Sequence, residues 1–69
     1  MYFLVEIIST ASETAKAVWE KSSVTEATMA LFQSMASAMA NLSVQTAMFM
    51  VIDKTGAIQR YEYWERPGV

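Results

Sequence analysis

The hydrophobic and polar positions at the start of the chain predict a β-strand. Tyr2 to Ile8 is rich in aromatic and β-branched residues and is followed by Ser9 and Thr10, a composition typical of a strand and its end. Both faces of this strand are apolar, with Glu6 as its one charged residue. A sheet with one face in water would leave apolar side chains uncovered, so we expect something to cover the second face or the edge.

The next segment predicts a first helix that ends near Ser22. Thr10 to Glu13 has the spacing of a capping box, in which the threonine hydroxyl and the glutamate carboxylate bond to free amides at a helix start. The residues that then recur at spacings of three and four, as on one face of a helix, are Ala11, Ala15, Val18, Trp19 and Ser22. Ser23 to Glu26 repeats the capping pattern, which predicts a break and a second helix start.

A second helix is predicted over about Thr25 to Asn41. Its main apolar stripe, which we expect to face the sheet, consists of Leu31, Phe32, Met35, Met39 and Leu42. Beside the stripe lie Met29, Ala36 and Ala40. The remaining side carries small residues in place of Lys and Glu, namely Ala30, Ser34, Ser37 and Asn41. No charged residue occurs from Ala27 to Ile52, so protein could cover this stretch on several sides without burying a charge.

The C-terminal part of the chain predicts a β-hairpin. Gln45 to Ile52 and Ala57 to Glu65 flank Asp53 to Gly56, which suits a type I turn with glycine in the left-handed position of a bulge. The last strand carries most of the charge of the predicted sheet and is followed by Pro67. We therefore expect this strand at one edge of the sheet.

The register that this turn favours places Phe49 opposite Tyr61. Tyr61 and Tyr63 would then share a face with Phe49, while Arg60 and Trp64 would share the opposite face. Arg60 and Trp64 are therefore candidates for stacking on a partner protein or a planar ligand. The alternative is an amphipathic outer strand whose aromatic rings cover the core and whose charges are solvated.

Together these elements predict one small α+β domain over residues 1–69, built as strand, two helices and hairpin. The expected architecture is a three-stranded antiparallel or mixed sheet packed on a helical pair. The first strand would form the second edge of this sheet, and an open apolar edge invites pairing with another chain. We therefore expect the sheet or the helices to be shared with a second subunit, through Tyr2, Leu4, Met29, Ala36 and Ala40.

Composition supports self-association. The chain has 69 residues, of which 54% are apolar, whereas a domain of this size hides only about 60% of its unfolded surface. It has no cysteine and no histidine, so disulfides are excluded and the commonest metal ligand is missing. Oligomerisation is the remaining way to stabilise so small a core.

Charge and motif content argue against several functional classes. Five basic and seven acidic residues leave no basic patch for nucleic acid. Polar residues such as Gln33 and Asn41 interrupt the uncharged run, which argues against a membrane span. The N-terminal residues lack the basic region of a signal peptide, so we expect a cytoplasmic protein. Without histidine, cysteine or a glycine-rich loop, we expect no enzyme, no metal site and no cofactor.

The leading interpretation is a small, non-catalytic, homo-oligomeric protein that acts through protein–protein contacts. The alternative is an oligomeric module that sequesters or senses a small anionic or nucleotide-like ligand at a subunit interface. Side chains that could converge on such a ligand, or on a protein partner, are Lys16, Trp19, Arg60, Tyr61, Tyr63 and Trp64.

Overall fold

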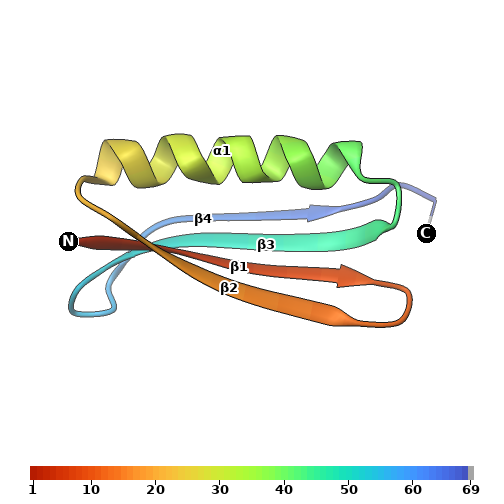
Figure 1. Cartoon of the computed structure of the whole chain (residues 1–69), viewed down its shortest axis with the longest axis horizontal. Coiled ribbons are helices and arrows are strands. Elements are labelled where there is room, and N and C mark those ends of the chain that lie inside the picture. Colours follow the sequence, from red (N-terminus) through yellow and green to blue (C-terminus); the bar gives the residue numbers. More distant parts are fainter. Residues whose placement is uncertain (69) are drawn as a thin grey trace.

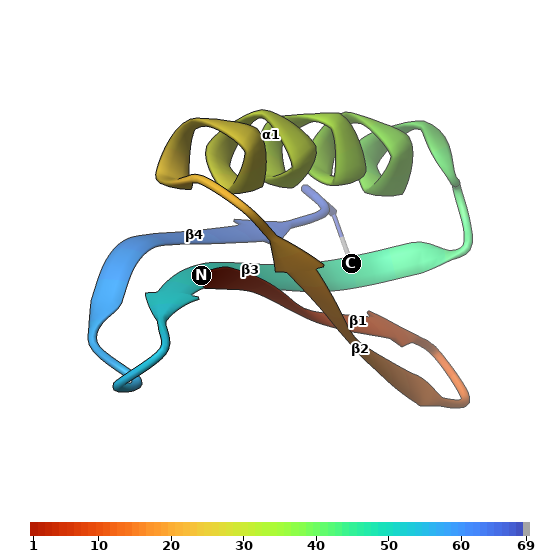
Figure 2. The same cartoon turned by 60° about the vertical axis from the view of Figure 1, so that its left-hand side comes forward.

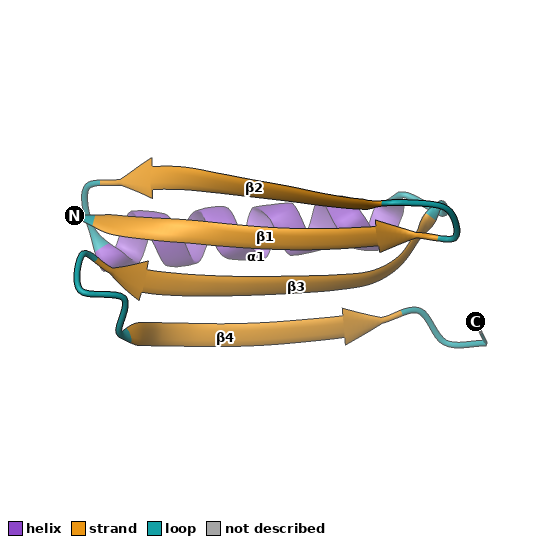
Figure 3. Cartoon of the chain, turned by 90° about the horizontal axis from the view of Figure 1, so that it is seen from below, coloured by secondary structure: helices purple, strands orange, loops and turns teal. Residues whose placement is uncertain are grey.

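A computed structural model describes residues 1–68 as four strands and one helix. In chain order they are β1 (Tyr2–Thr10), β2 (Thr14–Lys21), α1 (Val24–Ala40), β3 (Val44–Asp53) and β4 (Ile58–Glu65). The strands form one antiparallel sheet in the order β2-β1-β3-β4. The helix lies along one face of this sheet, and no other described element covers the opposite face (Figures 1 and 3). The fold therefore has two layers.

The prediction of a first helix before Ser22 is wrong, because Thr14 to Lys21 forms the edge strand β2. The capping-box residues instead close the β1–β2 hairpin. The Thr10 hydroxyl accepts a hydrogen bond from the Glu13 amide (3.3 Å), and the Thr10 amide donates to the Glu13 carbonyl (2.8 Å). Antiparallel pairing with the whole of β1 supplies the tertiary context that overrides the helical spacing.

This change corrects the predicted architecture. The sheet has four strands and a single helix covers it, in place of three strands and a helical pair. The first strand, β1, is also not an edge strand, since it pairs with β2 on one side and β3 on the other. Figure 2 shows the far end of the β1–β2 hairpin lying away from α1, which packs mainly over β1 and β3.

The second predicted helix and the hairpin are confirmed. The Ser23 hydroxyl caps α1 by accepting from the Glu26 amide (3.1 Å), as the sequence pattern indicates. In the β3–β4 turn, Asp53 Oδ1 accepts from the Thr55 and Ala57 amides (2.8 and 3.1 Å). Gly56 has a φ of 90°, a conformation that glycine adopts without strain.

The predicted register of the hairpin is wrong by one residue. Val51 pairs with Arg60 while Ile52 pairs with Ile58, so Gln59 is an extra residue in β4, which is the arrangement of a β-bulge. A shift of one residue moves every following side chain to the other face of the sheet. Tyr61 therefore lies opposite Met50 rather than Phe49.

The hydrophobic core lies between α1 and the two central strands. Its largest fully buried side chains are Leu4, Leu31, Phe49 and Val51. Smaller residues let the helix approach the sheet closely: Ala27, Ala38 and Ala47 are at most 4% exposed. This core uses only one face of each central strand, so the alternate residues of β1 and β3 point away from the helix.

Candidate functional site

The open face of the sheet, opposite α1, is the main candidate site. Figure 3 views the molecule from this side, with β2 and β4 at the two edges. Because side chains alternate between the faces of a strand, the neighbours of the buried Leu4 and Glu6 point outward here. These neighbours on β1 are Phe3, Val5 and Ile7, and none of them is charged.

The strand registers arrange the open face in rows of cross-strand neighbours. The central row is Val18, Val5, Met50 and Tyr61, from β2 to β4. On one side of it lies the row Glu20, Phe3, Ile52 and Ile58, and on the other the row Lys16, Ile7, Met48 and Tyr63. A terminal row of Thr14, Ser9, Thr46 and Glu65 is polar. Three consecutive rows are thus apolar except at the β2 edge.

We call the apolar part of these three rows the open-face patch. It consists of Phe3, Val5, Ile7, Val18, Met48, Met50, Ile52, Ile58, Tyr61 and Tyr63. The outer strands contribute its most accessible members, because Val18 is 63% and Ile58 is 60% exposed. The central residues are shielded by their neighbours in the sheet and are of intermediate exposure. The patch is continuous across all four strands.

Tyr61 and Tyr63, predicted as binding residues, belong to this patch. They are 54% and 52% exposed. The Tyr63 hydroxyl donates to the Glu65 carboxylate (3.2 Å), and partial desolvation together with this carboxylate raises the pKa of Tyr63 above its ordinary value. Tyr63 therefore remains protonated at neutral pH and adds a neutral ring with one polar end to the patch.

Arg60 and Trp64 share a face, as the sequence predicts, but it is the helix-facing side of β4. The Arg60 guanidinium lies 4.7 Å from the centre of the Phe32 ring and 3.0 Å from the Glu62 carboxylate. Trp64 packs against the core, with the Arg66 guanidinium 4.7 Å above its ring. Contacts within the chain therefore explain the positions of both side chains without a partner or ligand.

The structure separates the remaining predicted ligand residues within one subunit. Lys16 lies on the open face of β2, in register with Ile7. Trp19 lies on the other face of the same strand, where its indole Nε1 donates to the Glu6 carboxylate. Arg60 lies on β4, at the opposite edge of the sheet. Lys16, Trp19 and Arg60 therefore do not converge on one pocket.

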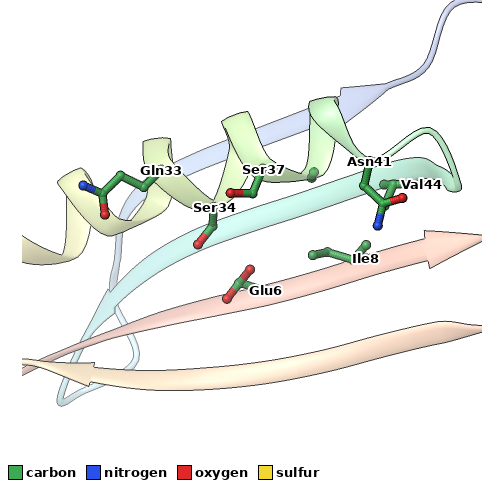
Figure 4. A pocket seen from close by; sticks show the side chains of 8 residues that line it. Glu6, Ile8, Gln33, Ser34, Ser37, Asn41 and Val44 are labelled. Atoms are coloured by element: carbon green, nitrogen blue, oxygen red, sulfur yellow. The ribbon is translucent and has the colours of Figure 1, made fainter.

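A second, polar feature is a groove of about 330 Å³ between α1 and β1 (Figure 4). Glu6, which is 8% exposed, lies in its floor, and the Ser34 hydroxyl is directed toward it from the helix. The other polar residues of the groove are Gln33, Ser37 and Asn41. Within residues 1–68 no basic side chain lines this groove. The buried carboxylate of Glu6 that faces it therefore disfavours an anionic ligand.

The residues predicted for a subunit contact divide between the core and the surface. Leu4 is 1% exposed and Tyr2 packs against the core, both beneath the helix. Met29 is 58% exposed on the outer side of α1, and Ala36 and Ala40 are also exposed there. The first strand thus offers Phe3, Val5 and Ile7 to a partner, rather than Tyr2 and Leu4.

Sequence reasoning missed this patch although part of its signal is visible in the chain. The two apolar faces of residues 2–8 indicate that a second layer is needed, and Met48 and Met50 alternate with core residues in the same way. The missing information was strand β2, which makes β1 a central strand, and the bulge at Gln59, which turns Tyr61 and Tyr63 onto the same side.

Comparison of the chain with protein-family models, with curated proteins and with solved structures finds no match. No helix within residues 1–68 is long and apolar enough to cross a membrane. The same residues contain no group of three or more histidine, cysteine, aspartate or glutamate side chains placed to hold a metal ion.

Proposed function

We propose that this is a small, non-catalytic, homo-oligomeric protein that acts through protein–protein contacts, with the open-face patch as its main contact surface. The observation that supports this function is the uncovered apolar face of the sheet. An antiparallel sheet with one face in water usually carries polar residues there. Here the outward residues of β1 from Phe3 to Ile7, and of β3 from Met48 to Ile52, are all apolar.

The size of the open face also supports a protein contact. Four strands spaced about 4.8 Å apart, each roughly eight residues long at about 3.3 Å per residue, outline an open face of about 500 Å², and the open-face patch makes up the larger part of it. Exposed apolar patches of a few hundred Å² and more commonly mark interaction sites. Two such faces packed together would bury about 1,000 Å² if they were flat, and the uneven surface of the side chains adds to this area. The contact therefore reaches the size of a specific interface.

The alternative of a small anionic ligand receives less support. Its candidate residues Lys16, Trp19 and Arg60 lie on two faces and two edges of the sheet. The polar groove beside α1 contains a buried carboxylate and no basic side chain. Neither the open-face patch nor the groove presents clustered cations of the kind that a phosphate or a carboxylate needs.

A matched pair of lysine substitutions tests the proposal. Val18 lies in the central row of the patch and is 63% exposed, so Val18→Lys adds a charge that the isolated chain tolerates in water. In an apolar interface the same charge would have no partner, and we expect the dissociation constant to rise at least ~100-fold, about 2.8 kcal/mol. Ala36→Lys adds the same charge on the exposed outer side of α1 and is the control.

Light scattering after size exclusion, over a series of protein concentrations, measures the outcome. We expect wild type and Ala36→Lys to form the assembly, and Val18→Lys to have the 7.7 kDa mass of one chain. Circular dichroism confirms that both variants remain folded. If Val18→Lys keeps the wild-type mass, or if Ala36→Lys is the variant that dissociates, the open-face patch is not the contact surface.

A further inference from the structure

The two charges that flank the open-face patch on β2 are arranged symmetrically about its central row. On the open face, β1 and β3 carry no charged residue between Phe3 and Ser9 or between Thr46 and Ile52. Strand β2 carries one charge of each sign, Lys16 and Glu20, at equal separations of two residues on either side of Val18. Two residues along a strand span about 6.7 Å, so both charges lie at the same distance from the central row.

From this arrangement we infer that the partner is a second copy of the chain, packed open face to open face about a twofold axis that crosses the strands at the row of Val18, Val5, Met50 and Tyr61. This inference rests on the proposed function, because it assigns the partner and the geometry of the same surface. Across a twofold axis, both chains contribute the same surface to the interface.

The axis pairs every residue of the neighbouring rows with a suitable partner. Lys16 of one copy faces Glu20 of the other, and the reverse pair occurs on the second side of the axis. The apolar rows also match, since Phe3 faces Ile7 and Ile52 faces Met48 across the interface. Packed sheets lie about 10 Å apart, a separation that the extended side chains of lysine and glutamate bridge together.

The charges also select this axis over the other twofold arrangement of two sheets. An axis parallel to the strands would place β2 of one copy over β4 of the other. Glu20 would then face Ile58, and Lys16 would face Tyr63. Glu20 would lose water beside Ile58 without facing an opposite charge, which is unfavourable. The axis across the strands satisfies both charges at once.

Charge reversal tests the geometry. In a homodimer of Lys16→Glu, two glutamates face each other at both sites, and in a homodimer of Glu20→Lys, two lysines do so. We expect each single variant to raise the dissociation constant at least tenfold, because like charges replace two opposite pairs. The double variant K16E/E20K restores both opposite pairs, and its dissociation constant should return to within about threefold of wild type.

Mixing the two single variants gives the most specific result. A dimer of one Lys16→Glu chain and one Glu20→Lys chain has an opposite pair at both sites, so the mixture should form heterodimers in preference to either homodimer. Native mass spectrometry separates the three species when one variant is uniformly labelled with 15N, because lysine and glutamate residues have nearly equal masses. An effect of Lys16 on Glu20 within one chain could explain rescue by the double variant, but it could not explain heterodimer formation.

The possible results distinguish the proposed contact surface from the twofold arrangement. A wild-type protein that stays monomeric at all concentrations overturns the proposed function and this inference together. A wild-type dimer that Val18→Lys dissociates, but whose single charge variants neither weaken it nor form heterodimers on mixing, overturns the twofold arrangement and leaves the contact surface in place. Weakened single variants with a restored mixture support both.

Discussion

Replacement of Arg66 by alanine tests how much its side-chain contacts, which join the end of β4 to the helical layer, contribute to folding stability. Arg66 Nε donates to the Val44 carbonyl (2.8 Å), and Nη2 donates to the carbonyls of Met39 (3.2 Å) and Asn41 (3.0 Å). The guanidinium also lies 4.7 Å from the centre of the Trp64 ring. One side chain thus joins β4 to the end of α1 and to the α1–β3 connection.

The expected loss follows from these contacts. A hydrogen bond from a charged donor contributes about 1.5–3 kcal/mol, and a cation–π contact contributes about 0.5–1 kcal/mol at exposed sites. Because the freed carbonyls of Met39 and Asn41 lie at exposed residues and can bond to water, we count about one full hydrogen bond. Arg66→Ala should therefore lower the free energy of unfolding by about 2–3 kcal/mol. Arg66→Lys should recover less than half of this, because a lysine lacks the planar fork of donors.

Arg60→Ala is the matched control, since Arg60 lies on β4, the strand that Arg66 directly follows, and also stacks on an aromatic ring, that of Phe32. Its ion pair with Glu62 joins side chains that are 43% and 31% exposed, and it donates to no backbone carbonyl within the described residues. Exposed pairs of this kind contribute less than about 1 kcal/mol. With the contact on the Phe32 ring included, we expect Arg60→Ala to cost about 1–1.5 kcal/mol. Because both arginines make an aromatic contact, the difference between the two variants reports the backbone hydrogen bonds of Arg66.

Urea unfolding followed by circular dichroism measures both variants, at a fixed protein concentration and in the Val18→Lys background, so that self-association adds no stability. In thermal unfolding the loss at Arg66 corresponds to a decrease of roughly 10 °C or more for a chain of this size. If the Arg66→Ala and Arg60→Ala variants agree within about 0.5 kcal/mol, the backbone contacts of Arg66 do not stabilise the fold as we describe.

Two further predictions distinguish the core from the open face and test the hairpin turn. Leu4→Ala should cost about 3–4 kcal/mol of folding stability because Leu4 is 1% exposed. Val5→Ala, on the open face, should change the unfolding midpoint of the monomer far less and should weaken self-association. Equal effects of the two substitutions on unfolding would contradict the assignment of faces. Hydrogen bonds from the Thr55 hydroxyl and amide lower the pKa of Asp53 below its ordinary 3.8. The ionised carboxylate therefore stabilises the folded state fully above about pH 4, and this stabilisation disappears as the pH falls through the lowered pKa. Asp53→Asn should accordingly be less stable than wild type at pH 7, and the difference should shrink as the pH falls below 3.8. A difference in urea midpoint that does not shrink with acid would refute the role of the charge.

The sequence correctly predicts those elements whose local residue patterns are typical of only one kind of secondary structure. The apolar run from Tyr2 to Ile8 forms β1, and the capping pattern at Ser23 starts α1. The Asp53 to Gly56 segment closes the β3–β4 turn. In each case the side-chain chemistry and the observed backbone agree without reference to a distant part of the chain.

Strand β2 could not be predicted in the same way, because its signals fit two structures. A threonine hydroxyl that accepts from an amide three residues later occurs at a helix start and also in a tight hairpin turn, and Thr10 makes this contact in the hairpin. The small residues Ala15 and Ala17 fit both a helical and an alternating pattern. The choice is made by pairing with β1, which is a tertiary contact.

The faces of β4 depend on one residue that no local pattern singles out. Gln59 is the extra residue between the pairs Val51 with Arg60 and Ile52 with Ile58. Without the bulge, Gln59 would pair with Val51, and Tyr61 and Tyr63 would share the helix-facing side with Phe49. With it they complete the open-face patch, so the composition of the candidate contact surface follows from a bulge of one residue.

The mass of the wild-type chain in solution shows whether the uncovered sheet face makes the protein self-associate. Light scattering over a concentration series should give twice the chain mass of 7.7 kDa, with dissociation on dilution. A mass of 7.7 kDa at every concentration, up to the limit of solubility, would contradict this self-association and show that the open-face patch does not bind a second copy.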